Sequence, residues 1–237
     1  MTKSKIKAIE KYGKVYIDRF LKQQKVDREI ILNDWYKALN FFFGKSFMRG
    51  RNDELSERFW VATMKVLDEH NPKKNYNRNE LENQLKTGGV NNKKDIHMVL
   101  GTLNFIFNSL GSFDNNIVRY AINEIKSKKL GEAYTELDKI PEVGDKIASF
   151  FLRDVIMIYE LEKFLTNDDF KYCQPVDTWV VQVALKLDII KTRGVQMQEI
   201  KSVIIKKCMD NEVSPLLFNT GAWMVGARSF ELLIEKL

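Results

Sequence analysis

Two residues, Lys146 and Asp177, could together carry out a nucleophilic substitution, with the lysine as nucleophile and the aspartate as proton acceptor. A lysine amine in its neutral form is a nucleophile that forms Schiff bases with carbonyl compounds, including sugars. A carboxylate beside it can accept a proton and stabilise a positive charge that develops during the reaction. Because each residue alone is common in proteins, the segments around them decide whether this chemistry is expected.

Lys146 follows a short turn that separates two expected helices. The segment IPEVGDK ends at Lys146, and we expect one helix to end near Ile140 and the next to begin at Lys146. Gly144 gives the turn the backbone freedom that a tight connection needs. The first N–H groups of a helix have no partner within that helix and attract anions. The sequence therefore predicts a helical hairpin whose second helix can hold a phosphate group.

Asp177 precedes a further expected helix. Pro175 ends the structure before it, and Val180 and Val183 begin an apolar helix face after it. Taken alone, Asp177 fits a plain helix N-cap, which stabilises a helix by about 1 kcal/mol. A hairpin that carries a lysine and is followed by this aspartate is far more specific than either part.

These two segments, in this order, resemble the signatures of the HhH-GPD superfamily of DNA glycosylases. In that family the hairpin commonly reads LPGVG followed by x-K-x-A, and here it reads IPEVG followed by DKIA. The second signature, V-D-x-x-V, matches VDTWV. Lys146 and Asp177 therefore match the catalytic lysine and aspartate of the bifunctional members. Glu142 departs from the family, which usually has glycine there, and its carboxylate repels a phosphate unless it points away.

The separation of the two residues resembles one branch of the superfamily. Asp177 lies 31 residues beyond Lys146 (177 − 146), which is similar to the long connection of the archaeal 8-oxoguanine (GO) glycosylases. That branch lacks the cysteine cluster of other members. The two cysteines here, Cys173 and Cys208, are too few for a four-thiolate cluster. We expect both thiols to be reduced and buried.

The segment SPLLFNTGAWMVGAR, at 214–228, looks like the closing helix of the same branch, in which a polar residue precedes a tryptophan and G-x-R follows. The resemblance implies that Trp223 stacks on the flipped base. It also implies that Phe150, Arg153 and Asn219 line the same base pocket. The simpler alternatives are core packing for the two aromatic residues and a solvent-exposed helix charge for Arg153.

The resemblance also implies how the hairpin meets DNA. Val143, Gly144 and Asp145 would contact the DNA backbone, an interaction that positions a protein without reading sequence. A monovalent cation at the hairpin fits the family, while no metal site and no organic cofactor is implied. Gln23 and Gln24 are candidates for the amide that reads the base.

Together the matches imply a bifunctional DNA glycosylase and abasic-site lyase that acts in base-excision repair of double-stranded DNA. The expected lesion is 8-oxoguanine, which must leave the duplex before it reacts. Attack by Lys146 on the sugar C1′ would displace the base and leave a Schiff base, from which β-elimination cleaves the strand. Asp177 would accept a proton and stabilise the positive charge on the sugar.

Two alternatives remain open at the level of sequence. The first is a glycosylase and lyase for oxidised pyrimidines, which would use the same lysine nucleophile but have a different base pocket. A non-catalytic helix-hairpin-helix protein that binds DNA would explain the hairpin and the charge, but not Lys146 together with Asp177.

The fold class expected is all-α, because apolar residues recur at spacings of three and four and alternating strand patterns are scarce. Residues 71–96 break this pattern and predict surface loops around a short helix. The helices are expected near 4–23, 27–43, 53–69, 79–87, 94–109, 115–128, 131–139, 146–164, 178–188, 196–209 and 215–235.

The resemblance implies two helical lobes with the active site in the cleft between them. One lobe is expected over 40–160 and ends in the helix-hairpin-helix of 131–158. The other is expected to combine 1–39 with 161–237.

Composition agrees with a DNA-binding protein without requiring one. The net charge is +6 and the pI is about 9.1, and a basic excess of this size permits nucleic-acid binding. No apolar run approaches the ~20 residues that a membrane span needs. We therefore expect a cytoplasmic, nucleoid-associated monomer that does not contact a membrane.

Overall fold

The computed structural model describes residues 3–22, 27–48, 50–192, 194 and 196–234. Over these residues the protein contains helices and no strand, so the all-α prediction is confirmed. The described residues divide into two compact units. One comprises 27–151, and the other joins the described parts of 1–26 and 152–237.

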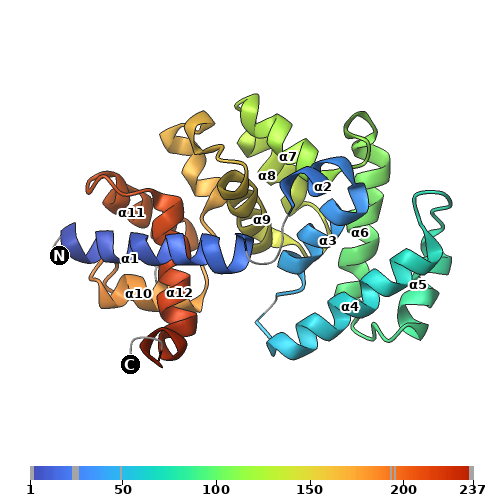
Figure 1. Ribbon diagram of the computed structural model, residues 1–237, viewed down its shortest axis with the longest axis horizontal. Helices are drawn as coiled ribbons and strands as arrows, with labels where there is room; N and C mark the ends of the chain where they lie inside the picture. The colour runs from blue at the N-terminus through green and yellow to red at the C-terminus, as the bar shows by residue number, and fades with distance from the viewer. Residues whose placement is uncertain (1–2, 23–26, 49, 193, 195, 235–237) are drawn as a thin grey trace. The chain divides into compact units, whose positions relative to one another are not determined.

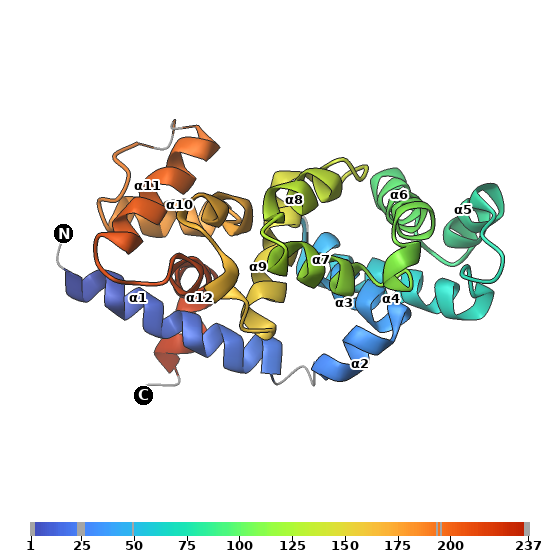
Figure 2. The same ribbon diagram turned by 90° about the horizontal axis from the view of Figure 1, so that it is seen from above.

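The unit of residues 27–151 contains seven complete α-helices, a 3-10 turn η2 and the first half of α9. In this unit α2, α3 and α7 pack side by side (Figures 1 and 2). Phe42 and Phe151 meet in its core with their ring centroids 5.0 Å apart. The elements are α2 (Arg28–Asn33), α3 (Trp35–Ser46), α4 (Asp53–His70), α5 (Arg78–Thr87), α6 (Lys93–Ser109), η2 (Gly111–Phe113), α7 (Ile117–Lys126), α8 (Leu130–Asp138) and α9 (Gly144–Ile158).

The other unit brings segments from distant parts of the chain together. Helix α1 lies across α12, as both views show (Figures 1 and 2). A Cβ atom added at Gly221 would lie 1.9 Å from the carbonyl oxygen of Ile9, so the two backbones meet where a side chain cannot fit. The elements are α1 (Lys3–Tyr16), the π-helical η1 (Ile17–Lys22), the rest of α9, η3 (Glu162–Phe164), η4 (Asn167–Cys173), α10 (Thr178–Lys186), α11 (Met197–Met209) and α12 (Pro215–Ile234).

Short polar side chains start most of these helices. Each of the helices α2 to α7 and α10 begins after an Asp or Asn whose side-chain oxygen accepts from a backbone N–H of the first turn. Such caps satisfy amides that have no partner inside the helix. They explain why most predicted helices begin within two residues of their observed starts.

The helices predicted over 27–43 and 146–164 differ from those observed. The helix predicted over 27–43 is divided at Asp34, whose N–H donates to Ile30 O at the end of α2 and whose carboxylate caps α3. The helix predicted over 146–164 ends at Ile158, because Glu160 adopts a left-handed conformation (φ 56°) that a right-handed helix cannot continue. The 3-10 helix η4 was not predicted.

The observed units differ in their boundaries from the two lobes expected. Residues 27–39 belong to the unit of 27–151, because Asn116 of α7 donates to the carbonyl oxygens of Ile31 and Leu32. Residues 152–160 belong to the other unit, in which Tyr16 donates to Asp154. No helix among the described residues is both long and apolar enough to span a membrane.

Candidate functional site

The predicted hairpin is a pair of helices joined by a five-residue turn. Helix α8 ends at Asp138, and α9 begins at Gly144. The Val143 N–H donates to Ile140 O over 3.0 Å, and both side chains are buried. A Cβ atom at Gly101 of α6 would lie 2.6 Å from Pro141 Cδ, so α6 packs closely on the turn. These contacts fix the conformation of the turn that precedes Lys146.

Glu142 occupies a backbone conformation that favours glycine. Its φ is 67°, and that of Gly144 is 61°. A left-handed conformation costs an L-residue about 1–2 kcal/mol. Glu142 stands where the similar signature usually has glycine. Its backbone adopts a conformation that glycine tolerates and that strains a glutamate.

Lys146 is the third residue of α9 and is half-buried. It is followed by Ile147 and Ala148, which are buried. Its neighbour Asp145 accepts a hydrogen bond from Tyr134 Oη over 2.6 Å, which ties α8 to the first turn of α9. The structure therefore gives Asp145 an internal partner, and its predicted contact with the DNA backbone stays a prediction, as do those of Val143 and Gly144.

Phe150 lies one helical turn beyond Lys146, on the same face of α9. It is half-buried. The ammonium of Lys45, on α3, lies 5.5 Å from the centroid of the Phe150 ring and 4.7 Å from that of Phe41. Lys45 is 7% exposed. Lys45 was not predicted as a site residue, since only the fold brings α3 to this face of α9.

Asp177 is the N-cap of α10, as its sequence context predicted. Its Oδ1 accepts hydrogen bonds from the N–H groups of Trp179 and Val180, each over 3.0 Å. The side chain is half-buried. Both capping bonds end on Oδ1, so the other carboxylate oxygen, Oδ2, takes no part in the cap.

Arg153 is buried, and the expectation of a solvent-exposed helix charge is wrong. Its guanidinium donates to Asp154 Oδ1 from Nε (3.0 Å) and Nη2 (2.8 Å), and Nη2 also donates to Tyr16 Oη over 3.0 Å. Nη1 donates to Asn219 Oδ1 over 2.8 Å, and Asn219 Nδ2 donates to Pro175 O over 2.9 Å. A chain of hydrogen bonds thus runs from α1 and α9 through α12 to the segment before Asp177.

The charges within this network stabilise one another. Burial disfavours the charged form of Arg153, but Asp154 and Tyr16 outweigh that effect and raise the pKa of the guanidinium. Burial, followed by the Asp154 carboxylate, raises the pKa of Tyr16 well above its usual value. The arginine therefore stays charged and the tyrosine stays neutral, which preserves every donor in the network.

Trp223 lies beside this network and is half-buried. Its ring meets that of Tyr16 edge to face, with centroids 5.7 Å apart and an interplanar angle of 83°. It also packs against the core cluster that includes Val176 and Val180. Packing against the core therefore explains the partial burial of the Trp223 ring, and its stacking on a base stays a prediction.

The predicted site residues fall into two groups, one in each unit. The unit of residues 27–151 contains the first group, which is Val143, Gly144, Asp145, Lys146 and Phe150. The unit that contains α12 holds the second group. The joining of the two groups into one active site stays a prediction. Gln23 and Gln24 lie outside the described residues. The second group is Arg153, Asp177, Asn219 and Trp223.

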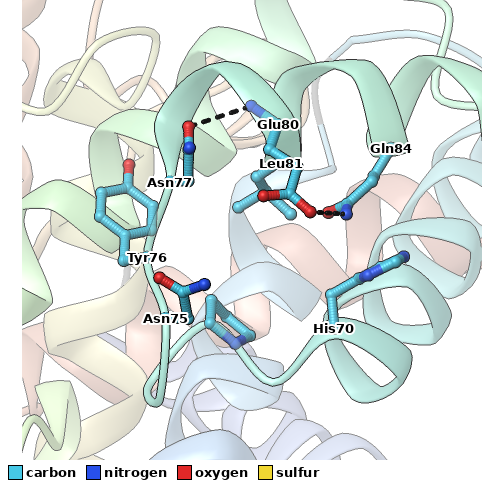
Figure 3. A pocket seen from close by; sticks show the side chains of 8 residues that line it. His70, Asn75, Tyr76, Asn77, Glu80, Leu81 and Gln84 are labelled. Carbon is cyan, nitrogen blue, oxygen red and sulfur yellow. Dashed lines mark hydrogen bonds between the residues drawn. The ribbon is translucent and has the colours of Figure 1, made fainter.

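A hollow of about 60 Å³ lies between the end of α4 and the start of α5. Figure 3 shows it lined by polar side chains, among them His70 and Asn75. Gln84 Nε2 donates to Glu80 Oε1 over 3.0 Å at its edge. Its lining contains none of the predicted site residues.

The described residues contain no group of three or more His, Cys, Asp or Glu side chains placed to hold a metal ion. Both cysteines are free and buried, as expected. A monovalent cation at the hairpin stays a prediction.

Comparisons with known proteins find a partial similarity. The chain is 36% identical over 72 residues to an uncharacterized protein, MJECL21, of Methanocaldococcus jannaschii. The aligned part is 30% of this chain and 16% of that protein. No family model matches the chain, and no solved structure matches it.

Proposed function

We propose that the protein is a DNA glycosylase and abasic-site lyase that removes an oxidised base, 8-oxoguanine, from double-stranded DNA. The observation that carries the proposal is the conformation of residues 130–158, in which two helices flank a tight turn and Lys146 lies in the first turn of the second helix. Glu142 and Gly144 adopt left-handed conformations in this turn, and a tight turn of this kind supports the proposal.

The surroundings of Asp177 also support the proposal. The carboxylate is half-buried at the start of α10, and its two capping bonds leave Oδ2 uninvolved in the cap. The Arg153–Asn219–Pro175 chain of hydrogen bonds restrains the backbone two residues before it. A catalytic group must be held within a fraction of an ångström of its working position, and such second-layer contacts provide this.

The proposed reaction has three steps. The neutral amine of Lys146 attacks C1′ of the flipped nucleotide, the N–C1′ bond forms, and the glycosidic bond breaks, so that the base leaves with the bonding electrons and takes up a proton. Asp177 stabilises the positive charge that develops on the sugar and accepts a proton from the amine. The C1′–O4′ bond then breaks and O4′ takes up the proton held by Asp177, which gives a protonated Schiff base on Lys146. Loss of the C2′ proton to water finally expels the 3′ phosphate with the electrons of its C–O bond.

The remaining residues would have supporting roles. Phe150 and Trp223 would offer faces for stacking, which stabilises a flipped base by about 1–3 kcal/mol for each aromatic contact. Arg153 and Asn219 would shape the pocket wall through their mutual hydrogen bond. The first-turn amides of α9 would hold a DNA phosphate. We propose a monomer as the working unit, acting on DNA in the nucleoid.

Borohydride trapping tests the proposal. The reagent reduces a Schiff base to a stable amine and leaves protein covalently bound to the DNA strand. We expect trapping on a duplex with one 8-oxoguanine, loss of trapping in Lys146→Gln, and retention in Lys126→Gln. Lys126 is an exposed lysine at the end of α7, so the control makes the same chemical change without touching the hairpin.

The same experiment separates the alternatives. If trapping occurs only on a duplex with an oxidised pyrimidine, the proposed substrate is wrong and the assignment of Lys146 as the nucleophile stands. DNA binding without trapping on any lesion would contradict catalysis and leave a binding protein. Trapping that survives in Lys146→Gln would contradict the assignment of the nucleophile.

A further inference from the structure

Gln174 is a buried polar side chain whose hydrogen-bonding capacity is unused. The residue is completely buried, and neither Nε2 nor Oε1 has a hydrogen-bond partner among the described residues. Buried amides in folded proteins are nearly always paired, because an unpaired donor or acceptor loses its bonds to water without replacement. An unpaired amide at this position is therefore unusual.

The backbone on both sides of Gln174 is held in place. Before it, Lys201 Nζ donates to Lys171 O over 3.2 Å, and Cys173 Sγ contacts Phe170 O at 3.4 Å. After it, Asn219 Nδ2 donates to Pro175 O over 2.9 Å. The backbone on either side of the unpaired amide is therefore restrained.

Gln174 also lies near Asp177 in the sequence. It lies three residues before Asp177, and its neighbour Pro175 ends the hydrogen-bond chain that starts at Arg153. An extruded base is bound in a closed pocket, where the protein groups that read its edge are buried from water. A buried amide without an internal partner has the properties that such a reading group needs.

We propose that the carboxamide of Gln174 reads the damaged base and selects an oxidised purine. This inference rests on the proposed base-excision activity. An amide presents one acceptor and one donor side by side, so it pairs with a base edge that carries a donor beside an acceptor. In 8-oxoguanine, N7 carries a hydrogen next to the O6 acceptor.

The same amide discriminates against undamaged DNA. Guanine presents two acceptors, N7 and O6, on this edge. The Gln174 oxygen would then face a lone pair on N7, while it accepts a hydrogen bond from N7 of 8-oxoguanine. A site that is built to form a buried hydrogen bond strongly rejects an analogue that cannot complete it. The proposed selectivity therefore comes from the amide rather than from pocket size.

Gln174→Met tests the role, since methionine has a similar length and flexibility without the amide. We expect excision of 8-oxoguanine, measured in single turnover, to fall roughly 10- to 100-fold, the discrimination of one bidentate pair. Cleavage of a duplex with a preformed abasic site should not change, because that substrate has no base to read. The melting temperature should stay equal or rise, because an unpaired buried amide is removed.

Thr102→Val is the matched control. Thr102, on α6, is also completely buried, and its hydroxyl has no hydrogen-bond partner in the part of the chain that the structure describes. The Thr102→Val variant should have an equal or higher melting temperature, and its rates of 8-oxoguanine excision and abasic-site cleavage should not change. Unchanged 8-oxoguanine excision in Gln174→Met would overturn the inference, as would an equal loss of abasic-site cleavage, which indicates a structural role. If the wild-type protein neither excises 8-oxoguanine nor cleaves the abasic site, the proposed function fails first and the inference falls with it.

Discussion

Among single residues, Asp177 combines a structural role with a proposed catalytic one, and substitution can separate the two. Its Oδ1 caps α10 through the N–H groups of Trp179 and Val180. Asparagine caps a helix about as well as aspartate, but it cannot accept a proton or stabilise a cation with a negative charge. The cap should therefore survive in Asp177→Asn, while the chemistry should not.

We predict that Asp177→Asn keeps the free energy of unfolding and slows base excision by on the order of 100-fold. Asp177→Ala should lose the activity and also about 1 kcal/mol of stability, measured by urea denaturation. Asp27→Asn makes the same change at the cap of α2 and should keep full activity. Full excision activity in Asp177→Asn would show that the aspartate is only a cap.

At the scale of elements, the hairpin between α8 and α9 carries a local strain that substitution can relieve. Glu142 has a φ of 67°, which a glycine adopts without penalty. We predict that Glu142→Gly raises the free energy of unfolding by about 1 kcal/mol. Glu136→Gly, in the interior of α8, should lower it by about 1 kcal/mol. Urea denaturation measures both, and a loss of stability in Glu142→Gly would argue against the turn described.

The crossing of α1 and α12 positions Tyr16 beside Trp223 and depends on a glycine. At Gly221 a Cβ atom would lie 1.9 Å from Ile9 O, which the backbone cannot accommodate without moving. We predict that Gly221→Ala lowers the free energy of unfolding by about 3 kcal/mol, at the upper end of the usual cost of overpacking. Gly111→Ala has no heavy atom within 4 Å of the added Cβ and should be tolerated. Equal stability of the two variants would contradict the close crossing.

At the scale of the whole molecule, stability should depend on the ionisation of Glu162. Burial raises the pKa of this carboxyl group, although the hydrogen bond from Ser214 lowers it, and Glu10 raises it further. The folded state thus prefers the protonated form. The stabilisation is fully present below the unfolded pKa of about 4.3 and is lost as the pH rises through the folded value.

We therefore predict that Glu162→Gln melts at a higher temperature than the wild type at pH 7, by on the order of 1–2 °C, and at nearly the same temperature at pH 4. Glutamine mimics the protonated acid and still accepts the Ser214 hydrogen bond. Glu212→Gln is the control, because Lys3 lowers the pKa of that exposed carboxyl group, so its loss should bring no gain at pH 7. A gain at pH 4 that vanishes at pH 7 would reverse the sign and contradict the burial of Glu162.

The sequence allowed much of the helical pattern to be predicted, because apolar spacing and Asp or Asn caps are local signals. The break at Asp34 was missed because one aspartate ends α2 and starts α3. The burial of Arg153 was missed for a different reason. Its partners Asn219 and Tyr16 lie 66 and 137 residues away, and local sequence does not indicate such contacts. The unpaired amide of Gln174 likewise depends on the contacts that hold its neighbours.

The central claim is that Lys146 forms a covalent bond to the sugar of damaged DNA, and locating that bond tests it most directly. The protein would be reduced with borohydride in the presence of a duplex that carries one abasic site, digested, and examined by mass spectrometry for the modified peptide. We expect a single adduct, on Lys146, that is absent from Lys146→Gln. An adduct on another amine, or no adduct at all, would contradict it.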